Sequence, residues 1–437
     1  MRHFRLCALA FFVCAATAAI ATSPSAQSVA ASSKANATGV RARDLASAPP
    51  DAVGISVDRL RRLDAAMKKL VDDQQVVGLV TLLERHGKIV HFNANGRLDA
   101  RRPDPLQKDS IFRIYSMTKP VTGVAMMMLY EEGKWRLDDP VARYLPELAR
   151  LKVYTGKNDD GTPKLEDARR PMTMRELMTH TGGLGYVLNA SNPVDKMIID
   201  ANVLNSAAPL NVMIDGLAKI PLLAQPGTRW SYSIAVDVQG YLVEKMSGQP
   251  FADFLRTRIF EPLGMKDTAF YVPKEKLARF SEVHGGAGAT LAIDTNRPDA
   301  SVPPVGASGG GGLFSTAPDY VRFCEMLLQG GQLNGVRLLA PRTVEMMRTN
   351  HVNPDALKTM APGTGWGMDF QVVMDAAAAG DSVSNGTFSW FGIAGTWFWI
   401  DPVEDLAFVG MVGHQSLGTT RPIHGLSRSL VYQAVLN

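Results

Sequence analysis

The chain has 437 residues, of which 46% are apolar and 20% are charged, and its formal net charge is +4. This composition is typical of a globular protein, and the length allows one large domain or two closely packed domains with a sizeable core. The near-neutral charge gives no electrostatic reason to expect a nucleic-acid partner, and we expect none.

The N-terminus has the pattern of a secretory signal peptide. Arg2 and Arg5 precede an apolar run over residues 6–21 that ends in small side chains. The run is too short for a stable membrane anchor. A bare hydrophobic anchor is the alternative, and a lipoprotein attached through Cys14 is a weaker one, because a bulky valine precedes that cysteine. We expect residues 1–26 to be cleaved from a periplasmic or secreted protein, which lowers its formal charge from +4 to +2 by removing the two arginines.

Residues 27–50 are rich in Ala, Ser, Asn and Pro, which predicts a disordered leader. Of the three cysteines only Cys324 follows the expected cleavage site, so we expect no internal disulfide in the mature protein. The Cys and His spacing does not fit a structural zinc site. The sequence therefore predicts neither a metal nor another cofactor.

The next segments predict a helix followed by an antiparallel hairpin. Ser56 is suited to cap a helix in which apolar residues recur at helical spacing over residues 60–70. Two β-rich runs then flank a turn at His86 and Gly87.

Residues from about 120 to 300 are mostly helical in pattern, broken by polar loops such as residues 155–170. Strand patterns return over residues 365–374, 387–400 and 406–412, before a closing helix from about residue 422 to 435. Strands at both ends of the chain predict an antiparallel sheet that the first and last helices cover. We therefore expect an α/β fold of the α+β type over residues 51–437, with a helical subdomain inserted between sheet segments and a cleft between them.

Ser116 and Lys119 form a Ser-x-x-Lys pair where a helix is predicted to start, running to about residue 132. Residues i and i+3 share a helix face, so the ammonium approaches the hydroxyl, and the free N–H groups of the first turn favour an oxyanion. We expect burial to depress the lysine pKa, so that the neutral amine accepts the serine proton. A capping serine beside a solvated lysine is the alternative, and this stretch alone leaves both open.

A rival nucleophile is Ser308, since residues 306–310 match the Gly-x-Ser-x-Gly elbow of α/β-hydrolases. That elbow needs a buried strand before it and a helix after it. Two prolines precede this segment and further glycines follow it, so we expect a glycine loop instead.

Tyr232 lies just before another predicted helix, where its phenol is able to project into a cleft. A phenolate is a competent general base when an ammonium lies close to it. Without other information, a half-buried tyrosine with a satisfied hydroxyl is the more common situation.

Five segments occur in an order that is informative when they are taken together. They are FRIYSMTKPVTGVAMMML, ELMTHTGGL, PGTRWSYSIAVDVQGYLVEKMSG, GGGGLFSTAPDYVRF and GTWFWIDPVEDLAFVGM. From about residue 53 to the last helix, the chain resembles the serine β-lactamase-like hydrolases, and most of all the family VIII carboxylesterases related to class C β-lactamases.

The resemblance implies roles for single residues. Ser116 would be the acylated nucleophile, with Lys119 and Tyr232 as its proton-handling network. The backbone N–H groups of Ser116 and Ile393 would hold the oxyanion.

The chain departs from the family pattern at three places. Trp390, Phe391 and Gly392 stand where β-lactamases have Lys-Thr-Gly and where esterases often have Trp-Gly-Gly. Ile234 replaces the asparagine that ends the tyrosine motif in many relatives. The His-Thr-Gly that starts at His180 matches the helix-and-turn segment of the family, so we interpret it as structural.

These departures bear on the substrate. A lysine at position 390 would pair with a substrate carboxylate, whereas an indole offers an apolar face. An uncharged ester of a small molecule is therefore the expected substrate, with Trp390, Phe391 and Gly392 in contact with it. Arg421 is a possible replacement cation, although a solvated residue at a helix start is favoured. A class C-like β-lactamase, a D-peptidase or a penicillin-binding protein is the alternative function.

His414 is the last candidate for substrate contact. If residues 401–405 form the turn of the late hairpin, Gly392 lies opposite His414, which places the imidazole at the edge of the site.

Overall fold

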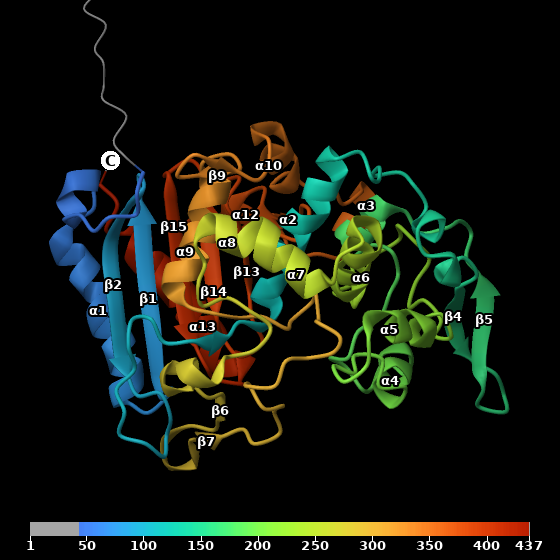
Figure 1. Cartoon of the computed structure of the whole chain (residues 1–437), viewed down its shortest axis with the longest axis horizontal. Coiled ribbons are helices and arrows are strands. Elements are labelled where there is room, and N and C mark those ends of the chain that lie inside the picture. The colour runs from blue at the N-terminus through green and yellow to red at the C-terminus, as the bar shows by residue number, and fades with distance from the viewer. Residues whose placement is uncertain (1–42, 437) are drawn as a thin grey trace, which may run out of the picture. The chain divides into compact units, whose positions relative to one another are not determined.

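The computed structural model describes residues 43–436, and a mainly antiparallel sheet forms their frame (Figure 1). Within these residues seven strands pair in the order β11-β12-β13-β14-β15-β1-β2. They come from both ends of the sequence: β1 (Gly78–Arg85), β2 (Lys88–Gly96), β11 (Thr364–Trp366), β12 (Gln371–Val373), β13 (Phe388–Phe391), β14 (Trp397–Asp401) and β15 (Leu406–Val412). Because β1 pairs antiparallel with β15, the two ends of the chain meet inside one sheet, and that prediction is confirmed.

The first and last helices, α1 (Val57–Asp72) and α13 (Leu417–Tyr432), share one apolar core with β1, β14 and β15. Ser56 caps α1 as predicted, accepting a hydrogen bond from the Arg59 N–H at 3.3 Å. The predicted start of the last helix is wrong. Ser416 caps α13 before Pro422, so the proline falls inside the helix.

The other face of the sheet is covered by α9 (Ala317–Leu328), and α2 (Thr118–Glu131) shares one apolar core with that face. Every residue of α2 from Thr118 to Leu129 is buried. A helix that is buried all round lies at the centre of a protein. Since α2 packs against α6 as well as near the sheet, it joins the sheet to the helical region.

The helical region lies beside the sheet and carries an outer hairpin (Figure 1). Its helices are α3 (Met174–Met178), α4 (Pro193–Asp200), α5 (Leu210–Leu217), α6 (Ala235–Ser247), α7 (Phe251–Leu255) and α8 (Glu261–Leu263). The hairpin, β4 (Lys152–Lys157) and β5 (Pro163–Asp167), lies where the sequence predicts a polar loop. All residues of β5 are exposed, so no apolar alternation marks it as a strand.

Short elements complete the described part of the chain. The short helices are α10 (Pro341–Met347), α11 (Pro354–Leu357) and α12 (Ala376–Ala379). Two-residue strands pair as β3 (Phe112–Arg113) with β8 (Phe314–Ser315), β6 (His284–Gly285) with β7 (Ala292–Ile293), and β9 (Gln332–Leu333) with β10 (Val336–Arg337).

The segment just before α1 is ordered, which corrects part of the predicted leader. The backbone N–H of Leu45 donates to Gly87 at 2.9 Å, so the segment runs along the edge strand β2. Arg43 reaches the carboxylates of Glu325 at 2.7 Å and Asp405 at 2.6 Å. These long-range ion pairs are invisible in a local composition. The predicted signal peptide and leader residues 27–42 lie outside the described residues.

Beside this ion cluster, Glu84 is fully buried. Burial and the nearby Glu325 carboxyl raise the pKa of Glu84 well above its ordinary value, and the Arg43 guanidinium opposes that shift. Arg43 therefore favours the charged form of the carboxyl groups around it. In the same core Cys324 has a free, buried thiol. None of the helices over residues 43–436 is long and apolar enough to cross a bilayer.

Candidate active site

Ser116 lies in a 3₁₀ turn, Tyr115–Met117, that leads directly into α2. The helix therefore begins slightly later than predicted. The backbone of Tyr115 has φ of 43°, in the left-handed region that a tyrosine adopts only under strain. Strained backbone persists where the surrounding structure holds it, often at functional sites.

Lys119, one turn into this segment, is completely buried. Its ammonium nitrogen Nζ donates to three acceptors: the Ser116 hydroxyl at 3.3 Å, the Tyr186 hydroxyl at 3.1 Å and the Gly310 carbonyl at 2.6 Å. Three acceptors match the three N–H bonds of an ammonium. The predicted contact between serine and lysine is present.

The expected depression of the Lys119 pKa is wrong. Burial lowers the pKa of Lys119, but the phenols of Tyr186 and Tyr232 and the nearby Asp237 carboxyl together raise it by more. The pKa of the ammonium therefore lies above its ordinary value. The lysine is a buried positive charge held by oxygen atoms, and a neutral amine is not the resting state.

Tyr232 lies just before α6, as predicted, and its hydroxyl accepts a hydrogen bond from Nε1 of Trp390 at 3.0 Å. The Lys119 ammonium lies 4.6 Å from the centre of its ring. The indole at position 390 is thus more than an apolar surface, because its N–H contacts the phenol oxygen.

His180 lies beneath the tyrosine, with ring centres 5.0 Å apart. Its Nδ1 is 2.8 Å from the Ser233 hydroxyl, which fixes the imidazole to the segment that carries Tyr232. Burial and then the Lys119 charge lower the pKa of His180 well below its ordinary value, so the ring is neutral. These contacts agree with the structural role predicted for the His-Thr-Gly segment.

Tyr186 is a site residue that the sequence analysis missed. It is buried, and burial raises the pKa of its phenol although the Lys119 charge opposes that shift. It therefore stays a neutral phenol that accepts from the lysine. It stands two residues after the end of the quoted ELMTHTGGL segment, and no local pattern distinguishes it from a core tyrosine.

The glycine loop over residues 306–312 has neither a strand before it nor a helix directly after it, as expected. The Ser308 hydroxyl donates to the Asp237 carboxylate at 2.5 Å, and the Gly310 N–H donates to the same oxygen at 3.0 Å. Burial raises the pKa of Asp237, and the Lys119 charge opposes the shift. Asp237 thus holds the loop whose carbonyl contacts Lys119.

Gly392 directly follows β13, close to the segment that carries the nucleophile. A Cβ atom at this position would lie 2.4 Å from Thr396 Oγ1 and 2.5 Å from the Ile114 carbonyl, which only glycine avoids. The following turn places Ile393 in the wall of the cavity that contains Ser116.

That cavity measures about 480 Å³. Its wall includes Ser116, Tyr232 and two of the predicted substrate contacts, together with several apolar and two cationic side chains: Tyr115, Ser116, Tyr186, Val187, Leu188, Trp230, Tyr232, Arg297, Gly310, Gly311, Trp390, Phe391, Ile393, Leu417 and Arg421. Lys119 lies behind this wall.

A model of the Beta-lactamase family matches residues 63–428. The chain belongs to the β-lactamase family. The predicted fold and the predicted resemblance to serine β-lactamase-like hydrolases are confirmed.

Three β-lactamase-family relatives show how far the similarity extends. An uncharacterized protein of Mycobacterium tuberculosis is 36% identical over 363 residues, covering 80% of this chain and 89% of that protein. Esterase EstB of Burkholderia gladioli is 30% identical over 408 residues, covering 89% of this chain and 99% of the esterase. The solved structure of EstCE1, a hydrolase with promiscuous acyltransferase activity, has a TM-score of 0.72 and 27% identity and covers 86% of this chain and 99% of that one.

The predicted pairing of Gly392 with His414 is wrong. Residues 387–401 form two strands, β13 and β14, that are joined by a turn. β15 pairs with β14, where Gly410 lies opposite Trp397, and not with β13. His414 instead donates its backbone N–H to Ala394 at 2.8 Å. The His414 side chain is buried beside His284 and does not line the cavity, so it has no substrate contact in this arrangement.

Arg421 is exposed near the start of α13, as the favoured interpretation has it, and it also lies at the site. Its guanidinium lies 4.3 Å from the centre of the Phe391 ring and lines the cavity. Among residues 43–436 no carboxylate forms an ion pair with it. The other arginine of the wall, Arg297, is paired with Asp294 at 2.6 Å.

Proposed function

We propose that this protein is a serine carboxylesterase that forms an acyl-enzyme on Ser116. The observation that carries the proposal is the buried Lys119 ammonium, which contacts the Ser116 hydroxyl in the floor of a mostly apolar cavity. Burying a charge costs free energy, and a buried ammonium beside a hydroxyl stabilises negative charge that develops there during a reaction. The similarity to EstB supports an ester as the substrate.

Tyr232 is the proposed general base. The Lys119 ammonium and the Trp390 N–H both stabilise negative charge on its phenol oxygen. The phenolate accepts the Ser116 proton while Oγ attacks the ester carbonyl carbon. The oxyanion is bound by the backbone N–H groups of Ser116 and Ile393.

When the tetrahedral intermediate collapses, the bond to the alcohol oxygen breaks and Tyr232 returns its proton to that oxygen. Water then attacks the acyl-enzyme and gives its proton to the same phenolate. The acid leaves, and the proton passes back to Ser116 Oγ. Lys119 keeps its proton throughout, which agrees with its raised pKa.

A second candidate rests on Arg421. Its guanidinium has no carboxylate partner within residues 43–436 and lines the cavity, so it is able to bind the carboxylate of a β-lactam or a peptide C-terminus. The substrate would then be a cephalosporin or D-peptide instead of an uncharged ester, with the same nucleophile.

Two measurements on the purified enzyme separate these candidates. We expect kcat/KM for a short p-nitrophenyl ester to exceed that for a coloured cephalosporin at least about tenfold, because an unpaired carboxylate in a partly dry cleft costs about 1–3 kcal/mol. A preference for the cephalosporin that Arg421→Ala removes would favour the second candidate instead. Intact mass and peptide mapping after a fluorophosphonate reaction should place the label on Ser116, and a label elsewhere contradicts both.

We also propose that residues 1–26 are a cleaved signal peptide and that the enzyme is periplasmic or secreted. The charged start and apolar run at the N-terminus support this. N-terminal sequencing of protein from fractionated cells tests it, and full-length protein retained in the cytoplasm would contradict it.

A further inference from the structure

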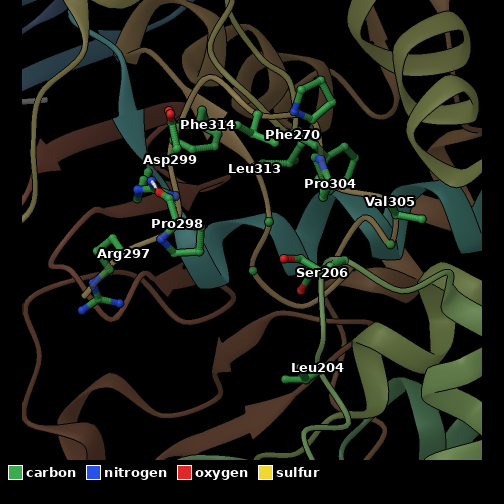
Figure 2. Close-up of a pocket in the computed structure, with 18 of the residues that line it drawn as sticks. Leu204, Ser206, Phe270, Arg297, Pro298, Asp299, Pro304, Val305, Leu313 and Phe314 are labelled. Atoms are coloured by element: carbon green, nitrogen blue, oxygen red, sulfur yellow. Dashed lines mark hydrogen bonds between the residues drawn. The ribbon is translucent and has the colours of Figure 1, made fainter. Parts of the chain in front are cut away.

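A second cavity of about 520 Å³ adjoins the one that contains Ser116. The two share Tyr115, Arg297 and Gly311 as common wall. Figure 2 shows Phe270, Leu313 and Phe314 on one side of the second cavity, with Leu204 and Ser206 opposite. Its size falls within the range of about 300–1,000 Å³ that is typical of small-molecule sites.

The common wall is thin at Gly311. A Cβ atom built there would meet only the backbone of Tyr115, at 3.8 Å, so the position has room that no side chain fills. The rest of the wall is held in place, because the Arg297 guanidinium lies 5.4 Å from the centre of the Tyr115 ring and is tied to Asp294.

The outer rim of the second cavity is apolar and open. Val302 and Val305 are 61% and 67% exposed, and two prolines lie between them. Exposed aliphatic side chains grouped on a concave surface are characteristic of a ligand-binding site.

The proposed reaction decides which part of a substrate points this way. The alcohol oxygen must lie near Tyr232, which protonates it, and the oxyanion must lie near the N–H groups of Ser116 and Ile393. An acyl chain that leaves the carbonyl carbon along the wall formed by Tyr115 and Gly311 leads toward the second cavity, which shares both residues.

We propose that the second cavity binds the distal part of an apolar acyl chain, which passes Gly311 to reach it. Preferred substrates are then esters of medium- or long-chain carboxylic acids, a specificity that rests on the proposed esterase function. Each methylene that the cavity buries should raise kcat/KM by up to about fourfold.

The first experiment compares p-nitrophenyl esters from acetyl to decanoyl in wild type, Val305→Asp and Val403→Asp. Val403 is a matched control, since it is 69% exposed and lies in the turn between β14 and β15, away from both cavities. We expect Val305→Asp to lower the decanoyl-to-acetyl ratio of kcat/KM at least tenfold. Val403→Asp should keep the wild-type ratio, and equal ratios in all three would overturn the inference.

The second experiment narrows the passage with Gly311→Phe, and Gly425→Phe is the control, because a Cβ at position 425 meets no atom within 4 Å. Gly311→Phe should lower the same ratio, whereas acetate esters of long alcohols should keep their wild-type ratio of decyl to ethyl ester. If Gly311→Phe lowered kcat/KM only for the acetate esters of long alcohols, the second cavity would bind the alcohol part of the substrate, and the inference would be overturned.

These outcomes are distinct from failure of the proposed function. A folded wild-type enzyme that hydrolyses no ester and is not labelled at Ser116 contradicts the esterase proposal itself. An enzyme that hydrolyses every ester at a rate independent of acyl length contradicts only the second cavity's role.

Discussion

Ser116 and Ser308 lie in two segments that touch each other, and each hydroxyl faces a buried charged residue. Ser116 accepts from the Lys119 ammonium, whereas Ser308 donates to the Asp237 carboxylate. Lys119 also donates to the Gly310 carbonyl, so the second segment is part of the support for the first.

The sign of the neighbouring charge separates the two serines. A carboxylate beside Ser308 accepts its proton in a hydrogen bond but would repel the negative charge of an attacking oxygen. An ammonium beside Ser116 would stabilise that charge, and it lies 4.6 Å from the ring centre of Tyr232, the proposed base. Ser308, within a nucleophile motif, therefore contacts the carboxyl group that holds its own loop, whereas Ser116, in a strained turn, has the contacts that the proposed reaction needs.

The largest expected effect is on the nucleophile. Ser116→Ala should lower kcat by about four orders of magnitude or more, since within residues 43–436 no other serine hydroxyl contacts the Lys119 ammonium. Ser308→Ala should keep most of the activity and lower stability by about 1 kcal/mol, because only a hydrogen bond to Asp237 is lost. Steady-state kinetics and thermal unfolding check both, and the reverse order of activities would exchange the two roles.

Tyr232→Phe keeps the ring and removes the group that carries the proton. We expect a loss of about two to four orders of magnitude in kcat, the scale of general acid–base catalysis. The losses in Tyr232→Phe and Lys119→Met should not add in the double variant, because the two residues act as a unit. Additive losses, or near-wild-type turnover in Tyr232→Phe, would contradict the assignment of the base.

Trp390→Phe tests the hydrogen bond to the phenol while an aromatic ring remains. Hydrogen bonds to charged groups contribute about 1.5–3 kcal/mol, so kcat should fall about ten- to a hundredfold. Trp366→Phe is the matched control, because its buried indole N–H has no hydrogen-bond partner and its ring packs on Trp390 at 4.6 Å. Equal losses in both variants would mean that packing, and not the N–H, is responsible.

The smallest effect is on stability, at the carboxyl group beside Ser308. Because burial raises the folded-state pKa of Asp237, its contribution to stability is fully present below the ordinary carboxyl pKa and is lost as the pH rises through the folded value. The Asp237→Asn variant has no carboxyl group to titrate, so it does not lose this stability as the pH rises. The amide oxygen of the asparagine still accepts hydrogen bonds from Ser308 and Gly310. The melting temperature of the variant should therefore decline less than that of wild type over this pH range. If the melting temperatures of the variant and of wild type declined equally with pH, this role of Asp237 would be contradicted.

The sequence predicted those parts of the molecule that depend on local spacing. Ser116 and Lys119 are three residues apart on one helical turn, and the apolar runs of β1, β14 and β15 are long enough to identify. Tyr186 was missed because it meets Lys119 across 67 positions of sequence, and no local pattern encodes such a contact.

The errors have the same origin. The lysine pKa depends on phenols and a carboxyl group from other elements, so burial alone gave the wrong direction. The placement of His414 assumed one continuous strand, but Gly395, with φ of 95°, closes a turn between β13 and β14. One turn changes every pairing beyond it.

The position of Arg43 determines where the polypeptide tolerates trimming. A form of the protein that began at Pro49 would keep every helix and every strand of the large sheet. It would nevertheless leave Glu325 and Asp405 without their shared guanidinium, next to the buried Glu84. Recombinant versions that start upstream of Arg43 should therefore express and crystallise better than shorter ones, although residues 43–48 belong to no helix or strand.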